Sequence, residues 1–423
     1  MMEGSASAPS DPMEAAPRGA TSGERARGLA RKGDDLVPTA HRELLDVYDW
    51  ACGRIAATAA RLDGSGEFPH VTEGGRWRTW PADVYAGWDG DEWSHGNWTC
   101  GFWVGLLWLA FLRTHDPRFA AWARRFGDLV APRQDDANTH DIGFVFYPSF
   151  ALGYWLTGEE AQKAPALAAA WTLLTRFNPG GEYLQAWGPL VHPLARRSTA
   201  IDTMMNLPLL WWAARVTGNS RFAEVARAHA ATSARHYLRP DGSTYHTYAF
   251  DPETGAADGG GTYQGASPES AWSRGVTWGI YGWALAYREH GDRAFLDAAE
   301  RAAAYFVGAL PGDLVPPWDF ADADSTAPRD SSATAICAGA FLELGEIHPD
   351  PRRRVFYRAL AEAMLGSLCH GYTSRGLDDE EGILLHSAYS VPHGDGVDSA
   401  VMWGEWFFLR AIAQATIGPI PIP

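Results

Sequence analysis

The chain has 423 residues, 46% of them hydrophobic and 13% aromatic, so it is long enough to bury a large core. Its formal net charge of −16 argues against nucleic acid or an anionic membrane as the partner. The cysteines show no metal-ligand spacing, and we expect free thiols in a reducing compartment. They are Cys52, Cys100, Cys337 and Cys369.

The N-terminal residues differ in composition from the rest of the chain. Residues 1–38 are rich in Ala, Gly, Ser, Pro and Arg and contain no apolar stretch of the kind a secretory signal has. We expect a disordered tail here, followed by one domain over residues 39–423. No later stretch reaches the ~18 apolar residues of a membrane span, so we expect a protein that is not membrane-bound and works in the cytoplasm.

Helical periodicity dominates after the tail, and two kinds of helix alternate along the chain. The first kind carries charges along one face and is predicted at residues 41–62, 117–131, 160–176, 220–237, 292–309 and 351–369. The second kind has almost no charge and is predicted at residues 101–113, 143–156, 202–217, 277–290, 332–346 and 399–416. A helix that is apolar all round has to be surrounded by other elements. The alternation therefore predicts an inner ring wrapped by an outer ring, an all-α (α/α)6 barrel.

The predicted helices are joined by links of two lengths. Links from an apolar to an amphipathic helix are short, such as "THDP" at 114–117 and "TGNS" at 217–220. Links in the other direction are long and rich in Gly, Trp and His, as in residues 177–201 and 238–276. Long loops in a compact domain usually carry function. We expect them to gather at the end of the barrel where the inner helices begin.

Two acidic residues lie where predicted inner helices start. Asp202 is in "STAIDTMMNLPLLWWAARV" (198–216), and Asp141 is in "NTHDIGF" (138–144). A single Asp in such a place is commonly a helix N-cap. Two of them in a partly desolvated, aromatic-walled cleft fit acid/base chemistry better, because their pKa values are pushed apart. Aromatic rings with carboxylates are what a carbohydrate site needs.

Further polar and aromatic residues on the long loops are candidates for substrate binding. They are Trp187, His246, Gln264 and Arg274. Arg274 stands just before an inner helix and beside Trp272, where it is well placed to hold a substrate carboxylate. The "THD" at 139–141 resembles a metal-ligand cluster only faintly, and there is no HExxH motif. We therefore expect neither a metal nor a cofactor.

Six blocks of sequence follow one another in a definite order. They are "WTCGFWVGLLWLAF", "THDIGF", "IDTMMNLPLLWWA", "TYQGASPESAWSRGVTWGIYG", "PPWDF" and "DSSATAICAGAFLEL". In this order they resemble the signatures of the unsaturated glucuronyl hydrolases, glycoside hydrolase family 88. The resemblance runs from about residue 75 to residue 416. It implies an (α/α)6 barrel, the fold that the helix pattern predicts independently.

The resemblance also implies an activity. The family acts on oligosaccharides left by polysaccharide lyases, which carry a 4,5-unsaturated uronate at the non-reducing end. It implies that Asp202 protonates C4 of the enol ether and helps to deliver water to C5, after which the hemiketal collapses and releases the neighbouring sugar. Asp141 corresponds to the family's second acid. The residues that fall where family residues surround the uronate are His140, Trp187, His246, Gln264 and Arg274.

Protonation of carbon requires a carboxyl group that holds its proton. We therefore expect Asp202 to be mostly protonated in the working complex, with its pKa raised by the surrounding Trp residues and the ionised Asp141. The expected partner is an unsaturated uronyl di- or oligosaccharide, with no nucleic acid and no membrane. We expect a monomer or a weak homo-oligomer.

The alternatives are the related unsaturated rhamnogalacturonyl hydrolases, a sugar 2-epimerase on the same barrel, and a sugar-binding barrel without catalysis. The "HDIGF" and "IDTMMN" blocks and the 264–275 loop fit the glucuronyl group better than the rhamnogalacturonyl group. An epimerase would be expected to use pairs of His, and retention of both Asp argues against a barrel without catalysis. Two positions depart from the family pattern: Glu405 stands where we expect Asp, and Cys100 stands where small polar residues are commoner.

Overall fold

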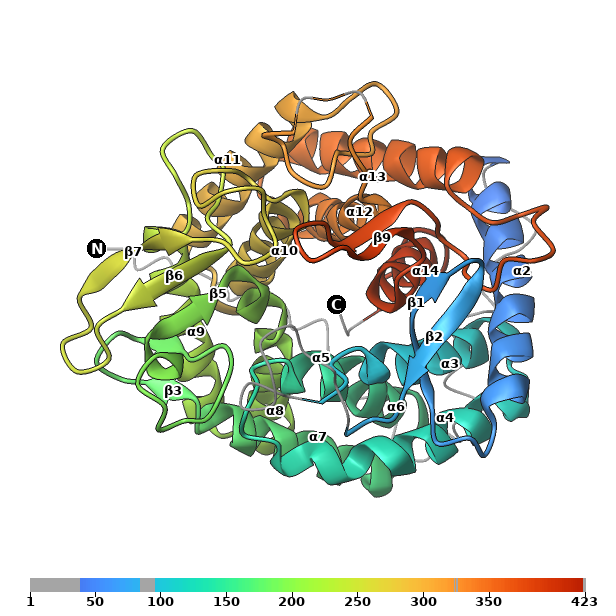
Figure 1. Cartoon of the computed structure of the whole chain (residues 1–423), viewed down its shortest axis with the longest axis horizontal. Helices are drawn as coiled ribbons and strands as arrows, with labels where there is room; N and C mark the ends of the chain where they lie inside the picture. The colour runs from blue at the N-terminus through green and yellow to red at the C-terminus, as the bar shows by residue number, and fades with distance from the viewer. Residues whose placement is uncertain (1–38, 84–95, 323, 325, 421–423) are drawn as a thin grey trace, which may run out of the picture.

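The computed structural model describes residues 39–83, 96–322, 324 and 326–420, and the tail predicted over residues 1–38 lies outside them. In the described part of the chain the helices form two concentric rings around one axis (Figure 1). A single cluster of buried apolar residues extends from Leu44 to Ile420. The predicted all-α (α/α)6 barrel is therefore confirmed.

The outer ring consists of the amphipathic helices that the sequence predicts. They are α2 (Thr39–Leu62), α4 (Pro117–Val130), α7 (Glu160–Leu174), α9 (Ser220–His236), α11 (Arg293–Ala309) and α13 (Pro351–Gly371). Four of them begin with an Asp or Asn whose side chain accepts a hydrogen bond from the amide two residues further on. These caps are Asp116, Asn219, Asp292 and Asp350. Such caps start a helix at once, so the links from inner to outer helices stay short.

The inner ring consists of the apolar helices. They are α3 (Cys100–Thr114), α5 (Ile142–Phe146) continued by α6 (Leu152–Thr157), α8 (Leu207–Thr217), α10 (Ser273–His290), α12 (Ser331–Ile347) and α14 (Met402–Ile417). Helix α14 packs against both α3 and α2, which closes the ring.

Two inner helices differ from the prediction of continuous α-helices. The helix predicted at 143–156 is interrupted by a π-helical turn, Tyr147–Ala151, which contains Pro148. Proline has no amide hydrogen to donate and its ring disturbs the preceding turn, which accounts for the interruption. The helix predicted at 202–217 opens with a 3₁₀ turn, η6 (Ile201–Met205), before α8 begins. Asp202 therefore lies on a tight turn ahead of the α-helix.

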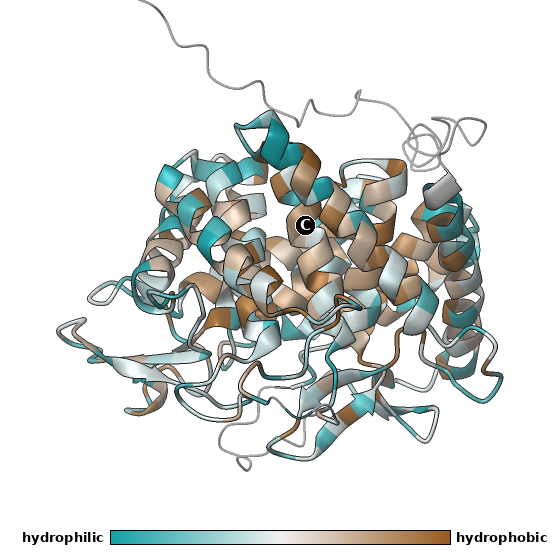
Figure 2. Ribbon diagram, turned by 90° about the horizontal axis from the view of Figure 1, so that it is seen from above, coloured by the Kyte–Doolittle hydropathy of each residue, from teal (hydrophilic) through white to brown (hydrophobic). Residues whose placement is uncertain are grey.

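The long loops contain short antiparallel strands, which the sequence did not predict. The strands are β1 (Phe68–Glu73) with β2 (Arg76–Trp80), β3 (Phe177–Asn178) with β4 (Tyr183–Leu184), β5 (Ser198–Ala200) with β6 (Thr247–Phe250) and β7 (Ala257–Gly261), and β8 (Ser387–Ser390) with β9 (Asp395–Ser399). Seen across the barrel, the strands and long loops lie at one end of the helices (Figure 2). This confirms that the long loops gather together.

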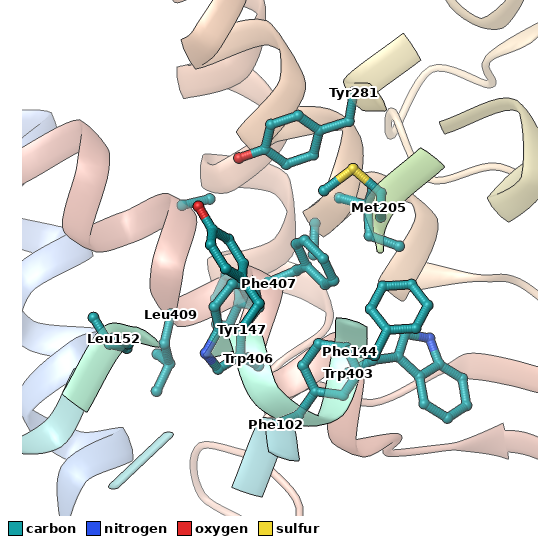
Figure 3. Packing of buried hydrophobic residues seen from close by; sticks show 14 of the residues in the cluster. Phe102, Phe144, Tyr147, Leu152, Met205, Tyr281, Trp403, Trp406, Phe407 and Leu409 are labelled. Atoms are coloured by element: carbon teal, nitrogen blue, oxygen red, sulfur yellow. The ribbon is translucent and has the colours of Figure 1, made fainter. Parts of the chain in front are cut away.

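Aromatic rings fill the interior of the barrel (Figure 3). Phe102 lies 5.3 Å from Phe144 and 5.6 Å from Trp406, measured between ring centroids. Trp278 lies 5.3 Å from Phe407 in an edge-to-face arrangement. Many of the 20 Trp are therefore core residues. The fully buried ones are Trp103, Trp108, Trp211, Trp278, Trp283, Trp403 and Trp406.

The thiols of all four cysteines are free, as predicted, and all four residues lie buried. Among the described residues, none of the helices combines the length and the apolar character needed to cross a membrane.

Glu405, the residue that departs from the expected Asp, is buried on the first turn of α14. Its Oε1 accepts hydrogen bonds from the amides of Ile383 and Leu384, at 2.8 and 3.0 Å, while its Oε2 is buried without a hydrogen-bond partner among the described residues. Burial raises the pKa of Glu405 to about 8, although the two amide hydrogen bonds oppose this rise. The side chain therefore fastens the loop that leads to β8, and it does so as a neutral acid below that pH.

Glu405→Gln tests this protonation state, because glutamine copies the shape of the protonated acid. The folded-state pKa lies above the ordinary value of 4.5, so the folded chain binds the extra proton and loses stability as the pH rises through the interval up to about 8. We expect the wild type to lose about 1.4 kcal/mol of unfolding free energy per pH unit, relative to the variant, within that interval. Urea unfolding of both proteins at several pH values measures this difference.

The exposed Glu224 on α9 offers a matched control. The Glu224→Gln variant should follow the wild type at every pH, because a solvated surface carboxylate contributes little to stability. Parallel curves for Glu405→Gln and the wild type would contradict a neutral, buried Glu405.

Candidate active site

Asp202 lies on η6, directly after strand β5, at the end of the barrel that carries the loops. Its side chain is 15% exposed, so one side of the carboxylate reaches solvent. Asp202 is not the capping residue of either helical segment here. The capping positions are Ala200 for η6 and Asn206 for α8, and neither side chain makes a capping hydrogen bond. The interpretation of Asp202 as an ordinary helix cap is therefore wrong.

His246, the residue directly before strand β6, lies close to Asp202. Its Nε2 lies 3.4 Å from Oδ2 of Asp202. Its Nδ1 accepts hydrogen bonds from the amides of Tyr263 and Gln264, at 3.1 and 3.2 Å. Because an amide only donates, Nδ1 carries no proton and the hydrogen of the neutral ring is on Nε2, the nitrogen nearer the carboxylate. The backbone of the loop thus sets the tautomer of the residue beside Asp202.

Asp141 forms a second pair with a histidine, at the start of α5. Its Oδ2 accepts a hydrogen bond from Oγ1 of Thr139 at 3.2 Å, and it makes no capping bond to the helix. Nε2 of His140 lies 3.3 Å from Oδ1 of Asp141, and Nδ1 of His140 lies 2.6 Å from Oγ1 of Thr203. Thr203 is the neighbour of Asp202, so the His140 ring connects the two acid-bearing segments.

The starts of α5 and α8 approach each other closely enough to exclude a side chain. A Cβ on Gly143 would lie 2.5 Å from Oδ1 and 2.6 Å from Cα of Asn206. Asn206 uses this proximity: its Oδ1 accepts a hydrogen bond from the amide of Phe144 at 2.6 Å, and its Nδ2 donates to the carbonyl of Asp202 at 3.3 Å. Gly143 and Asn206 therefore fix the position of Asp141 relative to Asp202.

The histidine between the two acids is neutral. Burial lowers the pKa of His140 to about 3, helped by the charges of Arg176 and His246 and opposed by that of Asp202. A neutral imidazole donates one hydrogen bond and accepts another. His140 therefore lies beside Asp141 without neutralising its charge.

The pKa of Asp202 differs from the expectation. Burial raises it, but the interactions with His246, His140 and Arg274 outweigh burial, so that the pKa lies below the ordinary value of 3.8. The prediction that Trp residues and Asp141 raise this pKa is therefore wrong for the free site, whereas the protonation of Asp202 in the working complex stays a prediction. The sequence revealed the apolar neighbours of Asp202 but not the histidine across the strand.

Arg274 lies on the first turn of α10 with its side chain only 2% exposed. Its Nη1 donates to Oδ2 of Asp330 at 2.6 Å and to the carbonyl of Ala388 at 2.5 Å, and its Nη2 donates to the carbonyl of Tyr389 at 2.6 Å. The guanidinium therefore joins the start of α10 to the cap of α12 and to β8. Direct contact of Arg274 with a substrate carboxylate stays a prediction. Its positive charge contributes to the lowered pKa of Asp202.

Gln264 and Trp187 complete the set of predicted residues. Nε2 of Gln264 donates to the carbonyl of Tyr389 at 2.9 Å, which joins its loop to β8. The half-buried ring of Trp187 stands edge-on to His140 and His246, with centroids 5.5 and 6.3 Å apart. The structure thus brings Trp187 and both acid–histidine pairs into one site, with Gln264 hydrogen-bonded to His246 at its edge.

Sequence reasoning missed several residues that shape this site. Asn206, Thr203 and Asp330 hold the predicted residues in place, and Trp98 stacks on Trp403 with centroids 4.8 Å apart near Tyr389. Asn206 is part of the sequence block "IDTMMNLPLLWWA", but the sequence does not show that it lies against Gly143, where there is no room for a side chain. In the part of the chain that the structure describes, groups of three or more His, Cys, Asp or Glu able to hold a metal do not occur.

An (α/α)6 barrel with two carboxylate–histidine pairs and aromatic rings at its loop end defines a carbohydrate-processing enzyme of the all-α barrel class. Comparison with known proteins gives the family. The model of Glycosyl Hydrolase Family 88 matches residues 77–315. The chain belongs to this family and is a glycoside hydrolase.

The relatives agree over most of the chain. The chain is 36% identical to the unsaturated glucuronyl hydrolase of Bacillus sp. (strain GL1), over 86% of this chain and 95% of the relative. It is 37% identical to the unsaturated chondroitin disaccharide hydrolase of Streptococcus pyogenes serotype M1, over 78% of this chain and 82% of the relative. The crystal structure of the Bacillus sp. GL1 enzyme superposes with a TM-score of 0.80, covering 88% of this chain and 96% of that chain at 34% identity. This membership favours hydrolysis over the epimerase and the non-catalytic alternatives.

Gly143→Ala tests the close approach that places the two acids. The new methyl group would overlap Asn206, so α5 and α8 have to separate. We expect a loss of about 1–3 kcal/mol in unfolding free energy together with a loss of activity. Denaturant unfolding and a turnover assay measure the two effects.

Gly53, on the exposed face of α2, provides the matched control because a Cβ there meets nothing within 4 Å. Gly53→Ala should raise the unfolding free energy by about 0.5–1 kcal/mol and leave activity unchanged. Equal behaviour of the two variants would contradict the role of Gly143.

Proposed function

We propose that this enzyme releases a 4,5-unsaturated uronic acid from the non-reducing end of oligosaccharides produced by polysaccharide lyases. The observation that carries the proposal is the pairing of Asp202 with His246 and of Asp141 with His140 within one aromatic-walled site. The names of the relatives, which are hydrolases of unsaturated glucuronyl and chondroitin disaccharide compounds, support the same substrate class.

In the proposed reaction, water adds across the C4=C5 double bond. Asp202 gives its proton to C4, and the resulting carboxylate accepts a proton from the water whose oxygen bonds to C5. The C5 hemiketal then opens, with the ring oxygen leaving C5 as the C5 ketone forms. The former ring oxygen takes up the hydroxyl proton and stays on C1, which is now a hemiacetal. This hemiacetal collapses to an aldehyde, which breaks the bond from C1 to the neighbouring sugar and releases that sugar with the proton on its oxygen. Atoms balance with one water consumed and one proton returned to Asp202.

Asp202 needs a proton for this step, whereas its pKa in the free site is low. The substrate supplies the missing influence, since its own carboxylate brings a second negative charge close to Asp202 and like charges raise a carboxyl pKa. Asp141, oriented by a neutral His140, adds to this effect. In this proposal, substrate binding raises the pKa of the carboxyl group that protonates the substrate.

We also propose that the enzyme works in the cytoplasm as a monomer or a weak homo-oligomer. Four buried, free thiols suit a reducing compartment. The exposed large apolar side chains of the described residues occur singly or in sequence neighbours rather than in long runs. They are Leu129, Trp171, Val191, Leu194, Val355, Phe356 and Leu377.

The double bond of the substrate provides an assay, because its conjugation with the carboxylate absorbs in the near ultraviolet. We expect the purified enzyme to abolish this absorbance with at least one unsaturated disaccharide from a panel derived from chondroitin, hyaluronan, heparin, gellan or xanthan, and pectin. The substrate turned over fastest identifies the sugar that follows the uronate. Absorbance that persists with every member of the panel would refute the proposed function.

Asp202→Asn tests the proposed proton donor. An amide cannot give a proton to C4, so we expect turnover to fall by about 10²- to 10⁴-fold while substrate still binds. Stopped absorbance assays measure turnover, and calorimetric titration with the disaccharide measures binding.

The capping residue Asp292 at the start of α11 is the matched control. Asn caps helices as well as Asp does, so Asp292→Asn should retain both stability and activity. Wild-type turnover by Asp202→Asn would remove Asp202 from the mechanism.

A further inference from the structure

Arg176 is a buried cation that the proposed reaction does not use. It follows α7 and is 2% exposed. No carboxylate of the described residues lies within salt-bridge distance of it, and its guanidinium donates to main-chain carbonyls instead. Burying a charge without an ion-pair partner is unfavourable unless every hydrogen bond is satisfied. A cation buried in this way calls for a specific role.

The carbonyls that Arg176 contacts belong to two segments of the site. Its Nε donates to Gln185 at 2.8 Å, and its Nη1 and Nη2 both lie 3.3 Å from the carbonyl of Gly188, so they hold the turn on either side of Trp187. Its Nη1 also donates to the carbonyl of Ala137, which leads into His140 and Asp141. One planar group thus spans both segments.

Backbone contacts join the same two segments directly. The amide of His140 donates to the carbonyl of Ala186 at 2.8 Å, and Thr139 pairs with Trp187 in an antiparallel bridge. A displacement of either segment would therefore move Trp187 and the His140–Asp141 pair together. The side-chain amide of Gln185 reinforces the turn: its Nε2 donates to the carbonyls of Trp187, Gly188 and Pro189, at 3.2 to 3.3 Å.

The charge of Arg176 also reaches the acid that it helps to place. Burial lowers the pKa of Arg176 to about 9, while Asp136 and Asp141 oppose the decrease. The same positive charge contributes to the low pKa of His140. Arg176 therefore interacts with the charge of Asp141 and favours a neutral His140, which is the state of His140 that the proposed reaction uses.

We infer that Arg176 is a positioning residue for this enzyme: it fixes Trp187 and the His140–Asp141 pair in one geometry by holding the carbonyls of Ala137, Gln185 and Gly188. The expected loss of kcat/KM rests on the proposed function. The expected displacement of Trp187 and of the His140–Asp141 pair does not depend on the substrate. Lysine does not replace this group, because a single ammonium lacks the planar fork that reaches all three carbonyls.

Arg176→Lys is the variant that tests the inference, with Arg410→Lys as the matched control. Arg410 is equally buried, on α14, seven residues beyond Trp403 in the sequence and away from the two segments. We expect kcat/KM of Arg176→Lys to fall about 10- to 100-fold through misplacement of the site, whereas Arg410→Lys keeps wild-type kinetics even if it loses stability. A loss of the same size in both variants would overturn the inference.

A double-mutant cycle with Trp187→Ala separates positioning from general destabilisation. If Arg176 acts through the Trp187 turn, the loss caused by Arg176→Lys becomes much smaller once Trp187 is absent, because coupled residues are not additive. Full additivity of the two losses would count against the inference.

Amide hydrogen exchange gives a readout that needs no substrate. Arg176→Lys should speed exchange of the amides of His140 and Ala186, which are hydrogen-bonded to Ala186 and Ser198 respectively, and Arg410→Lys should not. Unchanged exchange in Arg176→Lys overturns the inference even if the enzyme acts on none of the panel. An inactive wild type with the predicted exchange change would instead refute only the proposed function.

If Arg176→Lys does not fold, Arg176→Gln takes its place. Its side chain is shorter, and its single amide cannot reach the carbonyls of Ala137, Gln185 and Gly188 together. We expect the same pattern of faster exchange and lower kcat/KM. Wild-type exchange and kinetics in Arg176→Gln would show that the turn does not need the guanidinium and would overturn the inference.

Discussion

The structure depends on the burial of an inner ring of helices that carry almost no charge. Such helices have to be enclosed on every side, and the amphipathic outer helices enclose them. Because the five inner helices that precede an outer helix are followed by short links, four of them capped, the long connections are confined to the other end. The long loops with the candidate site residues thereby lie over the starts of the inner helices. Residues more than a hundred positions apart, such as Gln264 and Tyr389, come into contact there.

Within this frame, two contacts between neighbouring elements determine the site. Gly143 permits α5 to approach the turn before α8 until Asn206 bonds to both, and this places Asp141 near Asp202. The β5–β6 pairing then brings His246 against Asp202, with the amide of Ile201 donating to the carbonyl of His246 at 2.9 Å. The chemistry therefore depends on backbone packing in which small and polar residues matter as much as the acids.

The sequence was sufficient for the fold and for the places of Asp141 and Asp202 in it, because both depend on periodic or local patterns. Apolar and amphipathic segments alternate over hundreds of residues, and Asp141 and Asp202 stand at the starts of inner helices. What it could not give were relations across the barrel. The partner of Arg274 is Asp330, the proton position on His246 depends on the amides of Tyr263 and Gln264, and the low pKa of Asp202 comes from histidines on other elements. The strands of the loops were missed since they are short and lack sustained alternation.

The charges around the acids explain how a chain of net charge −16 accepts an anionic substrate. Two guanidinium groups, Arg274 and Arg176, lie buried behind the acids, and both influence the titration of groups in the site. Asp330 compensates Arg274, whereas among the described residues the guanidinium of Arg176 donates to main-chain carbonyls and has no carboxylate within salt-bridge distance. Because these cations lie in a medium of low dielectric, their attraction for a uronate is stronger than that of surface charges. In the proposed reaction the uronate also brings its own negative charge close to Asp202, and this charge raises the pKa of that carboxyl. In that proposal the binding of the uronate and the protonation of Asp202 are coupled, whereas a neutral sugar brings no such charge.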